Sequence, residues 1–311
     1  MHYTGMLVTL EDCMHINEIF AREPLTFSFE FFPPKDEDAA PFQAMVSDLA
    51  SLDPSFVSVT YGAGGKARRK THETVVKLKA ENNLEPVAHL TLVCHSKDEI
   101  REILTNYAME SIGNLMVLGG DPPRDMPNHD RSQDAFRYAA QLVHYVKEFN
   151  ALGIHPHKDG FGIGVAGFPE GHPGTPNRLK EMQHLKAKVD AGADYICTQL
   201  FFDNAEFYDF RERCELEGIK VPIVAGIMPV VSKPNMERMA ELSGGTRYPA
   251  KLLKSVRACS NNAEVKEVGI AWAIDQCRDL LKNGVSGIHF YTLNQSDATR
   301  QVMRRLGIHS R

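Results

Sequence analysis

The chain has 311 residues, of which 43% are hydrophobic and 24% are charged, so it can form one large domain or two of ordinary size. Forty acidic and thirty-five basic residues give a formal net charge of -5, which disfavours nucleic acid and anionic membranes as partners. The N-terminus lacks a basic segment followed by an apolar one, and no apolar run reaches the roughly 18–20 residues that span a bilayer. We therefore expect a cytoplasmic protein.

Short runs rich in β-branched and aromatic residues recur along the chain, and amphipathic helical patterns separate them. Eight such units in this length imply a parallel sheet closed into a (β/α)8 TIM barrel, which is an α/β fold, in a single domain. Residues 1–25 are expected to form an N-terminal helical segment, and residues 26–311 the catalytic barrel. The eight predicted strands begin at Thr26, Phe56, Pro86, Asn114, Gly162, Tyr195, Val221 and Gly287.

The intervening segments mix charge with spaced apolar positions and are predicted to be helices. Between Pro229 and Ser286 there is room for about two helices before the last strand. A doubly wound sheet is disfavoured, because no glycine of a dinucleotide-binding turn follows the first strand. The predicted helices cover residues 66–82, 96–111, 133–150, 178–191, 205–218 and 264–283, and the glycines expected to end helices are Gly113, Gly153, Gly192, Gly218 and Gly284.

The cysteines and histidines do not form a metal-binding pattern. Six cysteines are scattered with no C-x-x-C pair, which fits a reduced compartment better than a disulfide framework. His89 and His172 have no partner at i+4, so the sequence predicts no metal site. The run His155-Pro156-His157 lies in a polar loop and is predicted to be solvated.

Polar residues stand where the predicted strands end. Because active sites of (β/α)8 barrels lie at the C-terminal ends of the strands, we expect these side chains to converge. They are Glu30, Thr60, His89, Asp121, Glu170 with His172, Gln199 and Tyr291.

Glu30 lies in an otherwise apolar strand. Desolvation by Phe29, Phe31 and Phe32 would raise its pKa toward neutrality, which suits a general acid, while the alternative is a structural, hydrogen-bonded carboxylate. Asp121 follows two glycines and precedes two prolines, so it is either a carboxylate presented to a ligand or the first residue of a capped turn. The Gln199 amide could form hydrogen bonds with the edge of a heterocycle, or it could form them with backbone groups in the core.

The segment from Phe168 to Lys188 enters a helix through Gly, Thr, Pro and Asn. A helix N-terminus flanked by cations can bind a phosphorylated cofactor. The same cations can equally be the solvated face of an amphipathic helix. They are Arg178, Lys180, Lys186 and Lys188.

Eight motifs lie at or near the strand ends. They are SFEFFPP at 28–34, SVTYGA at 58–63, HLT at 89–91, GDPP at 120–123, FPEGHP at 168–173, KVDAGADYICTQLFFD at 188–203, GIMPV at 226–230 and HFYTLN at 289–294. Together they resemble the methylenetetrahydrofolate reductase family in its bacterial, catalytic-domain-only form, over about residues 26–307. The resemblance implies a barrel that binds FAD, takes electrons from NADH or NADPH, and reduces methylenetetrahydrofolate to methyltetrahydrofolate by ping-pong exchange, for methionine synthesis. It also implies a homo-oligomer.

The resemblance also assigns roles to residues. Glu30 is implied to be the general acid that protonates the folate nitrogen, and Asp121 the carboxylate near flavin and pterin. Gln199 is implied to contact folate or nicotinamide in turn, and Tyr291 to lie close to the flavin or substrate. The positions implied to contact FAD are Thr60, His89, Leu118, Gly120, Ala139, His172 and Lys188.

The chain departs from the family pattern at positions that are carried over as site residues. Gly119 and Ala187 stand where family members commonly have arginines, so two phosphate contacts are missing, and Arg124, Arg178 or Lys180 are candidates to restore the charge. The other departures are Phe168, Glu181 and His184 among the cofactor positions and Gln295 among the substrate positions.

Two other readings remain open. The missing arginines are compatible with a barrel that binds a pterin without flavin, such as a methyltransferase or an idle partner subunit. A flavin reductase driven by another electron donor, such as ferredoxin, would keep the same folate chemistry. Bound oxidised flavin is yellow, so colour separates the first reading from a flavoprotein.

Overall fold

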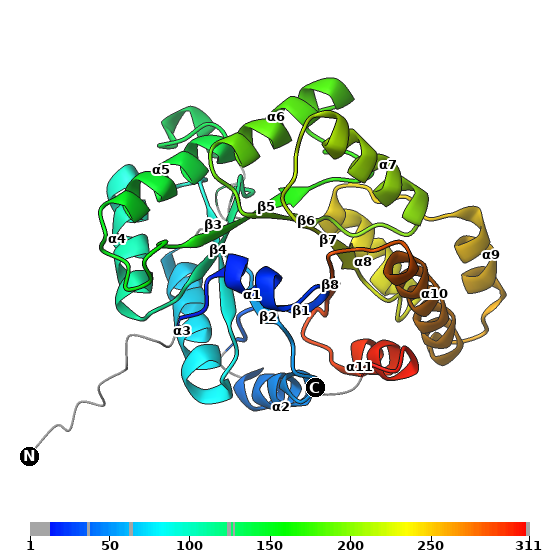
Figure 1. The fold of residues 1–311 in the computed structure, drawn as a ribbon. Helices are drawn as coiled ribbons and strands as arrows, with labels where there is room; N and C mark the ends of the chain where they lie inside the picture. Colours follow the sequence, from blue (N-terminus) through cyan, green and yellow to red (C-terminus); the bar gives the residue numbers. More distant parts are fainter. Residues whose placement is uncertain (1–12, 36–37, 62–64, 123–125, 127, 309–311) are drawn as a thin grey trace, which may run out of the picture.

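The computed structural model describes residues 13–35, 38–61, 65–122, 126 and 128–308. Eight parallel strands close into a barrel in which each strand pairs with its neighbour in sequence and β8 pairs with β1 (Figure 1). The predicted TIM barrel is therefore confirmed. The strands are β1 (Thr26–Phe31), β2 (Phe56–Val59), β3 (Pro86–Thr91), β4 (Asn114–Leu118), β5 (Gly162–Gly167), β6 (Tyr195–Thr198), β7 (Ile223–Ile227) and β8 (Gly287–Tyr291).

Seven strands begin at the predicted residue, and β7 begins at Ile223, two residues later than predicted. The delay has a local cause, because Pro222 has no N–H to donate to a sheet. Helices surround the sheet (Figure 1). They are α1 (Ile16–Arg22), α2 (Ala39–Ala50), α3 (Gly65–Asn82), α4 (Lys97–Met109), the 3₁₀ turn η2 (Arg131–Gln133), α5 (Ala139–Ala151), α6 (Arg178–Asp190), α7 (Asn204–Leu216), α8 (Lys233–Ser243), α9 (Ala250–Ala258), α10 (Asn262–Lys282) and α11 (Asp297–Arg305).

Three predictions about the helices were wrong. The helix predicted from residue 133 begins only at Ala139, and Gln133 belongs to the separate turn η2. The segment from Pro229 to Ser286 holds three helices, because Gly244 in the left-handed region ends α8 early. Gly153, Gly192, Gly218 and Gly284 have positive φ as expected, but Gly113 does not. Ser111 takes the left-handed conformation after α4 instead, and a Cβ at Gly113 would overlap the Cys13 thiol. Gly113 is therefore a close-packing residue.

The two faces of each strand have different partners. Phe29 and Phe31 of β1 face outward and pack in the same core cluster as Val46 and Leu49 of α2. Successive side chains of a strand point to opposite faces, so Ser28 and Glu30 point into the barrel. The barrel interior is therefore partly polar, while the apolar core lies between sheet and helices.

Helix α1 closes the end of the barrel where the strands begin (Figure 1). Its Ile16 and Ile19 are buried against Phe56, Val87 and other residues at the strand starts. The Asn114 side chain holds this plug, since its Oδ1 accepts from Ile16 N (2.7 Å) and its Nδ2 donates to Met14 O (2.8 Å). The expected helical N-terminal segment of residues 1–25 contains α1, and residues 1–12 lie outside the described residues.

The His155-Pro156-His157 run is not solvated as predicted. His155 is buried, and its Nε2 lies 3.0 Å from the carbonyl oxygen of Ile112. The His157 ring stacks on His15 beside α1 at 5.3 Å. Packing against the barrel floor thus overrides the polar character of this loop.

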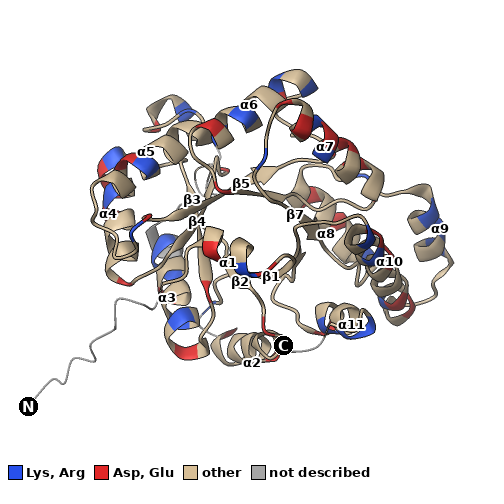
Figure 2. Cartoon of the chain, in the orientation of Figure 1, with Lys and Arg blue, Asp and Glu red and all other residues tan. Residues whose placement is uncertain are grey.

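In the view of Figure 2, charged residues of both signs are interspersed over the outer helices. No helix among the described residues is long and apolar enough to cross a membrane.

Candidate active site

A carboxyl and an imidazole face each other at the C-terminal end of the barrel. Glu30 is buried in β1, and its Oε2 lies 3.7 Å from Nε2 of His89 in β3. Burial raises the pKa of Glu30 to about 8 and lowers the pKa of His89 to about 4. The raised pKa agrees with the sequence argument, but its source differs, since Phe29 and Phe31 face the helices and the barrel interior desolvates Glu30.

Further polar side chains line the interior below Glu30. The imidazole of His289 lies between two hydroxyls, with Nδ1 at 2.7 Å from Ser28 Oγ and Nε2 at 3.4 Å from Ser58 Oγ. Burial and the neighbouring His89 lower the pKa of His289 to about 3. The Tyr291 hydroxyl donates to Thr198 O at 2.7 Å, so the tyrosine is held at the strand ends by β6.

Sequence reasoning missed Ser28, Ser58 and His289. Each is a polar residue inside an apolar strand and lies two positions before a residue that was singled out, namely Glu30, Thr60 and Tyr291. Side chains two apart in a strand share a face. This period-two signal could have identified the inward-facing set.

The turn after β4 places Asp121 outside the barrel interior. Leu118 ends β4 and pairs with Thr91, while Gly120 has φ +73°. A Cβ at Gly120 would lie 2.6 Å from Thr91 Cβ, so glycine is required here for both conformation and space. Asp121 is exposed beyond this turn, which is compatible with both predicted roles.

Residues predicted to contact a cofactor gather around the ends of β4 and β5. Lys188 donates from Nζ to Ala166 O at 2.5 Å, and burial lowers the pKa of its ammonium to about 8. The rings of Phe168 and His172 meet edge-on at 4.7 Å. His184 of α6 stacks on Tyr138, which directly precedes Ala139 at the start of α5, with ring centroids 5.2 Å apart. Tyr138 was not predicted as a site residue.

Two of the four cations of the predicted anion site form ion pairs with nearby carboxylates. Arg178 forms an ion pair with the buried Glu181 at 3.2 Å, and Lys186 pairs with Asp190. Lys180 is exposed, and Arg124 lies outside the described residues. Lys188 is the member of this set whose ammonium is buried at the strand ends, and no carboxylate of the described residues lies within ion-pair distance of it.

Gln199 follows β6 and borders a small pocket with Phe168, Glu170 and Arg247. Glu170 Oε2 accepts from Thr246 Oγ1 (2.9 Å) and Arg247 N (2.8 Å), which ties the β5 end to the loop after α8. Oε1 of Glu170 is buried without a hydrogen-bond partner among the described residues.

Two other predicted positions lie at loops after strands. Thr60 is half-buried directly after β2, and its carbonyl accepts from Thr71 Oγ1 at 3.0 Å. Gln295 is exposed after β8, where its N–H donates to Thr292 O at 2.9 Å.

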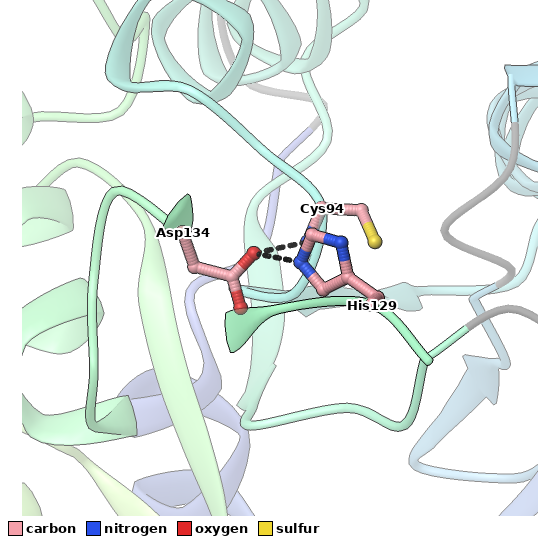
Figure 3. A group of neighbouring side chains, drawn as sticks. All are labelled: Cys94, His129 and Asp134. Carbon is pink, nitrogen blue, oxygen red and sulfur yellow. Dashed lines mark hydrogen bonds and ion pairs between the residues drawn. The ribbon is translucent and has the colours of Figure 1, made fainter. Parts of the chain in front are cut away.

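A Cys–His–Asp group lies beside this site (Figure 3). One ligand atom each of Cys94, His129 and Asp134 lie within 4.8 Å of one another, which is compatible with a metal ion. Asp134 Oδ1, however, already accepts from Cys94 N (2.8 Å) and lies 2.6 Å from His129 Nε2. Arg131 also adds positive charge, with its Nε 3.7 Å from Oδ2. The group therefore works as a clamp between the loops after β3 and β4.

The fold and this strand-end constellation define a (β/α)8-barrel enzyme with a buried acid at the catalytic end of the barrel. The methylenetetrahydrofolate reductase family model matches residues 15–307. A 5,10-methylenetetrahydrofolate reductase of Pectobacterium carotovorum subsp. carotovorum is 35% identical over 286 residues, which cover 91% of each chain. The chain belongs to the methylenetetrahydrofolate reductase family and is an oxidoreductase.

Two further comparisons concern a plant relative and a solved structure. Methylenetetrahydrofolate reductase (NADH) 1 of Arabidopsis thaliana is 35% identical over 305 residues, which cover 94% of this chain and 50% of the plant protein. A solved structure of an uncharacterised Clostridium thermocellum protein that binds two copies of 5-methyl-5,6,7,8-tetrahydrofolic acid has a TM-score of 0.64. It is 13% identical and covers 95% of this chain and 99% of its own, so this likeness shows the fold alone.

Proposed function

We propose that the protein reduces 5,10-methylenetetrahydrofolate to 5-methyltetrahydrofolate with NADH or NADPH, through a bound FAD and by ping-pong exchange. Membership of the family supports the reaction, and the name of the Arabidopsis relative supports NADH as the reductant. The observation that carries the proposal is the buried carboxyl of Glu30, whose pKa of about 8 keeps it protonated at neutral pH.

Glu30 is the proposed general acid. Its carboxyl donates a proton to the folate nitrogen, the bond from that nitrogen to the methylene carbon breaks, and the resulting iminium carbon accepts hydride. His89 stays neutral at pH 7, so it does not stabilise the ionised carboxylate of Glu30 as a cationic imidazole would. The barrel interior thus holds the acid in its donating form until the substrate arrives.

The residues at the ends of β4 and β5 fit an anionic, aromatic cofactor. The Lys188 ammonium is desolvated, and its nearest charged group, Glu181, is already paired with Arg178, so a phosphate would neutralise it. The stacked Tyr138 and His184 offer a flat aromatic surface beside it. When bound, FAD would supply hydride transfer, and the protein would orient it. The other residues proposed to hold it are Thr60, His89, Leu118, Gly119, Gly120, Asp121, Ala139, Phe168, His172, Glu181 and Tyr291.

The proposed folate contacts come from loops that follow three other strands, β4, β6 and β8. Asp121 would accept hydrogen bonds from the pterin, and the Gln199 side chain would contact folate or nicotinamide in turn. Gln295, which is exposed after β8, would contact the outer part of the substrate. Donor and acceptor groups that are aligned in this way fix the orientation of a heterocycle.

An anaerobic visible spectrum tests the proposal. The protein is prepared with FAD supplied, then NADH is added, followed by methylenetetrahydrofolate. We expect bleaching of the yellow band by NADH and its recovery with folate. A protein that retains no flavin would support the pterin-binding alternative, and flavin that NADH and NADPH leave oxidised would indicate another electron donor.

A further inference from the structure

Gly119 leaves the end of β4 without a side chain, and an arginine from a distant position reaches this point. Arg131, twelve residues later in η2, donates from Nη2 to Gly119 O at 3.3 Å. A Cβ built on Gly119 would lie 3.9 Å from the same nitrogen, and it would contact no other described atom within 4 Å. The Arg131 guanidinium therefore occupies the space that a side chain at position 119 would enter.

The clamp described above positions this arginine. Asp134 has a side chain that is only 1% exposed, and its Oδ2 lies 3.7 Å from Arg131 Nε. The other oxygen accepts from Cys94 N and is in contact with His129, so two loops fix the carboxylate (Figure 3). Arg131 is still 46% exposed, and of its five N–H groups one has a hydrogen-bond acceptor among the described residues. Most of its donors are free for a ligand.

A second cation reaches the neighbouring strand end. Lys188 Nζ donates to the carbonyl oxygen of Ala166, which is one residue after Val165 in β5. Arg131 donates to the carbonyl oxygen of Gly119, which is two residues after Val117 of β4. Val117 and Val165 are register partners, and adjacent strands are about 4.8 Å apart. Both cations thus lie on carbonyl oxygens at adjacent strand ends. Burial lowers the pKa of the Lys188 ammonium and the carboxylate of Glu181 raises it, but Glu181 is already paired with Arg178. Lys188, Asp121 and His184 are in turn the charged and titratable neighbours of the His172 imidazole.

We propose that Arg131 and Lys188 form an anion subsite at the ends of β4 and β5 that binds the phosphates of FAD, with Arg131 supplying the charge that Gly119 lacks. This inference rests on the proposed function. A planar guanidinium binds two phosphate oxygens at once, and a buried ammonium adds a point charge, so the pair suits a pyrophosphate. The subsite makes the chain's flavin binding depend on η2 and its clamp.

Flavin binding to the apoprotein tests the subsite without measuring activity. Dissociation constants for FAD and for riboflavin, which has no phosphate, are obtained from quenching of flavin fluorescence. We expect Arg131→Gln to raise the Kd for FAD by about tenfold to a hundredfold, the range for loss of a charge-assisted hydrogen bond, and to leave riboflavin unchanged. Arg101→Gln removes the same charge from an exposed position of α4 and is expected to change neither constant.

A double variant that moves the positive charge from position 131 to position 119 gives a sharper test. Gly119→Arg placed in the Arg131→Gln protein returns a guanidinium to the same space from the strand itself, and we expect it to recover most of the FAD affinity. Unchanged FAD binding in Arg131→Gln overturns the subsite alone, as does equal weakening of FAD and riboflavin, which would indicate a structural role. Wild-type protein that binds no FAD overturns both this proposal and the proposed function.

Discussion

Glu30 and His89 lie within ion-pair distance, yet both are neutral at pH 7. Their nearest atoms, Oε2 and Nε2, are 3.7 Å apart in the barrel interior. Because burial raises the pKa of the acid to about 8 and lowers that of the imidazole to about 4, each group keeps its uncharged form across the interval between these values. The contact is therefore between the protonated carboxyl of Glu30 and the neutral imidazole of His89, and it is not an ion pair.

The first prediction concerns the proton donor. Glu30→Gln keeps the size of the side chain and removes its proton, so we expect reduction of the bound flavin by NADH to continue and folate reduction to fall by about 10²–10⁴-fold. Anaerobic stopped-flow absorbance measures the two half-reactions separately. The matched control is Glu85→Gln, since Glu85 is another glutamate whose pKa burial raises, to about 7, and it pairs with Lys79 at 3.7 Å. Equal loss in both half-reactions for Glu30→Gln would assign Glu30 a structural role.

The second prediction is the pH dependence of folding stability. Glu30 has a folded pKa of about 8 against 4.5 for the free side chain, so its contribution is present below pH 4.5 and is lost as the pH rises to about 8. Glu30→Gln should therefore gain stability relative to wild type over this window. Thermal unfolding followed by circular dichroism at several pH values measures the difference, and a difference that is constant with pH would contradict a raised pKa.

The third prediction is a pH dependence of folding stability that runs in the opposite direction to that of Glu30. His289 has a folded pKa of about 3 against 6.5 for the free side chain, so its contribution is present above pH 6.5 and is lost as the pH falls toward 3. The stability of wild type relative to His289→Gln should therefore decline as the solution is acidified. The same unfolding series provides the measurement, and a wild-type protein that resists acid better than the variant would refute it.

The fourth prediction separates two roles of glycine. A Cβ at Gly226 in β7 would overlap the carbonyl oxygen of Thr198, whereas nothing lies within 4 Å of a Cβ at Gly218, which has φ +71°. We expect Gly218→Ala to lower the free energy of unfolding by about 1–2 kcal/mol through backbone strain alone. Gly226→Ala should lose more, about 3 kcal/mol or above, because β6 and β7 would have to separate. Urea denaturation measures the free energy of unfolding of both variants, and an equal decrease in the two would disprove the steric argument.

The fifth prediction concerns the plug that closes the barrel. Asn114→Ala removes both hydrogen bonds that hold α1 and leaves the buried Ile16 N–H unsatisfied, so we expect a loss of about 2–4 kcal/mol of unfolding free energy. Amide exchange over residues 16–22 should accelerate more than exchange in the strands. Asn17→Ala is the control, because Asn17 makes an exposed bond to Asp194, worth about 0.5–1 kcal/mol. Uniformly faster exchange would show that Asn114 supports the whole barrel.

Local sequence was enough to predict the strands and the residues at their ends. Strands that are covered on both faces need near-continuous apolar runs, so such runs in the sequence are enough to locate them. Glu30 is conspicuous as a carboxylate within one of these runs. Where the predictions failed, the cause was a contact with a remote segment. Gly113 packs against Cys13, and His155 is buried although its loop is polar.

The pattern of residues along the chain was thus sufficient for the barrel, its eight strands and the acid at the end of β1. Which polar groups meet depends on the closed fold: His289 joins Ser28 across 261 positions, and Arg131 reaches Gly119 from a separate turn. The fold also sets which charges are desolvated, so that the Lys188 ammonium has a lowered pKa while Lys186 pairs with Asp190. This division arises because a hydrophobic pattern is local, whereas desolvation and hydrogen bonding depend on atoms that only the closed barrel brings together.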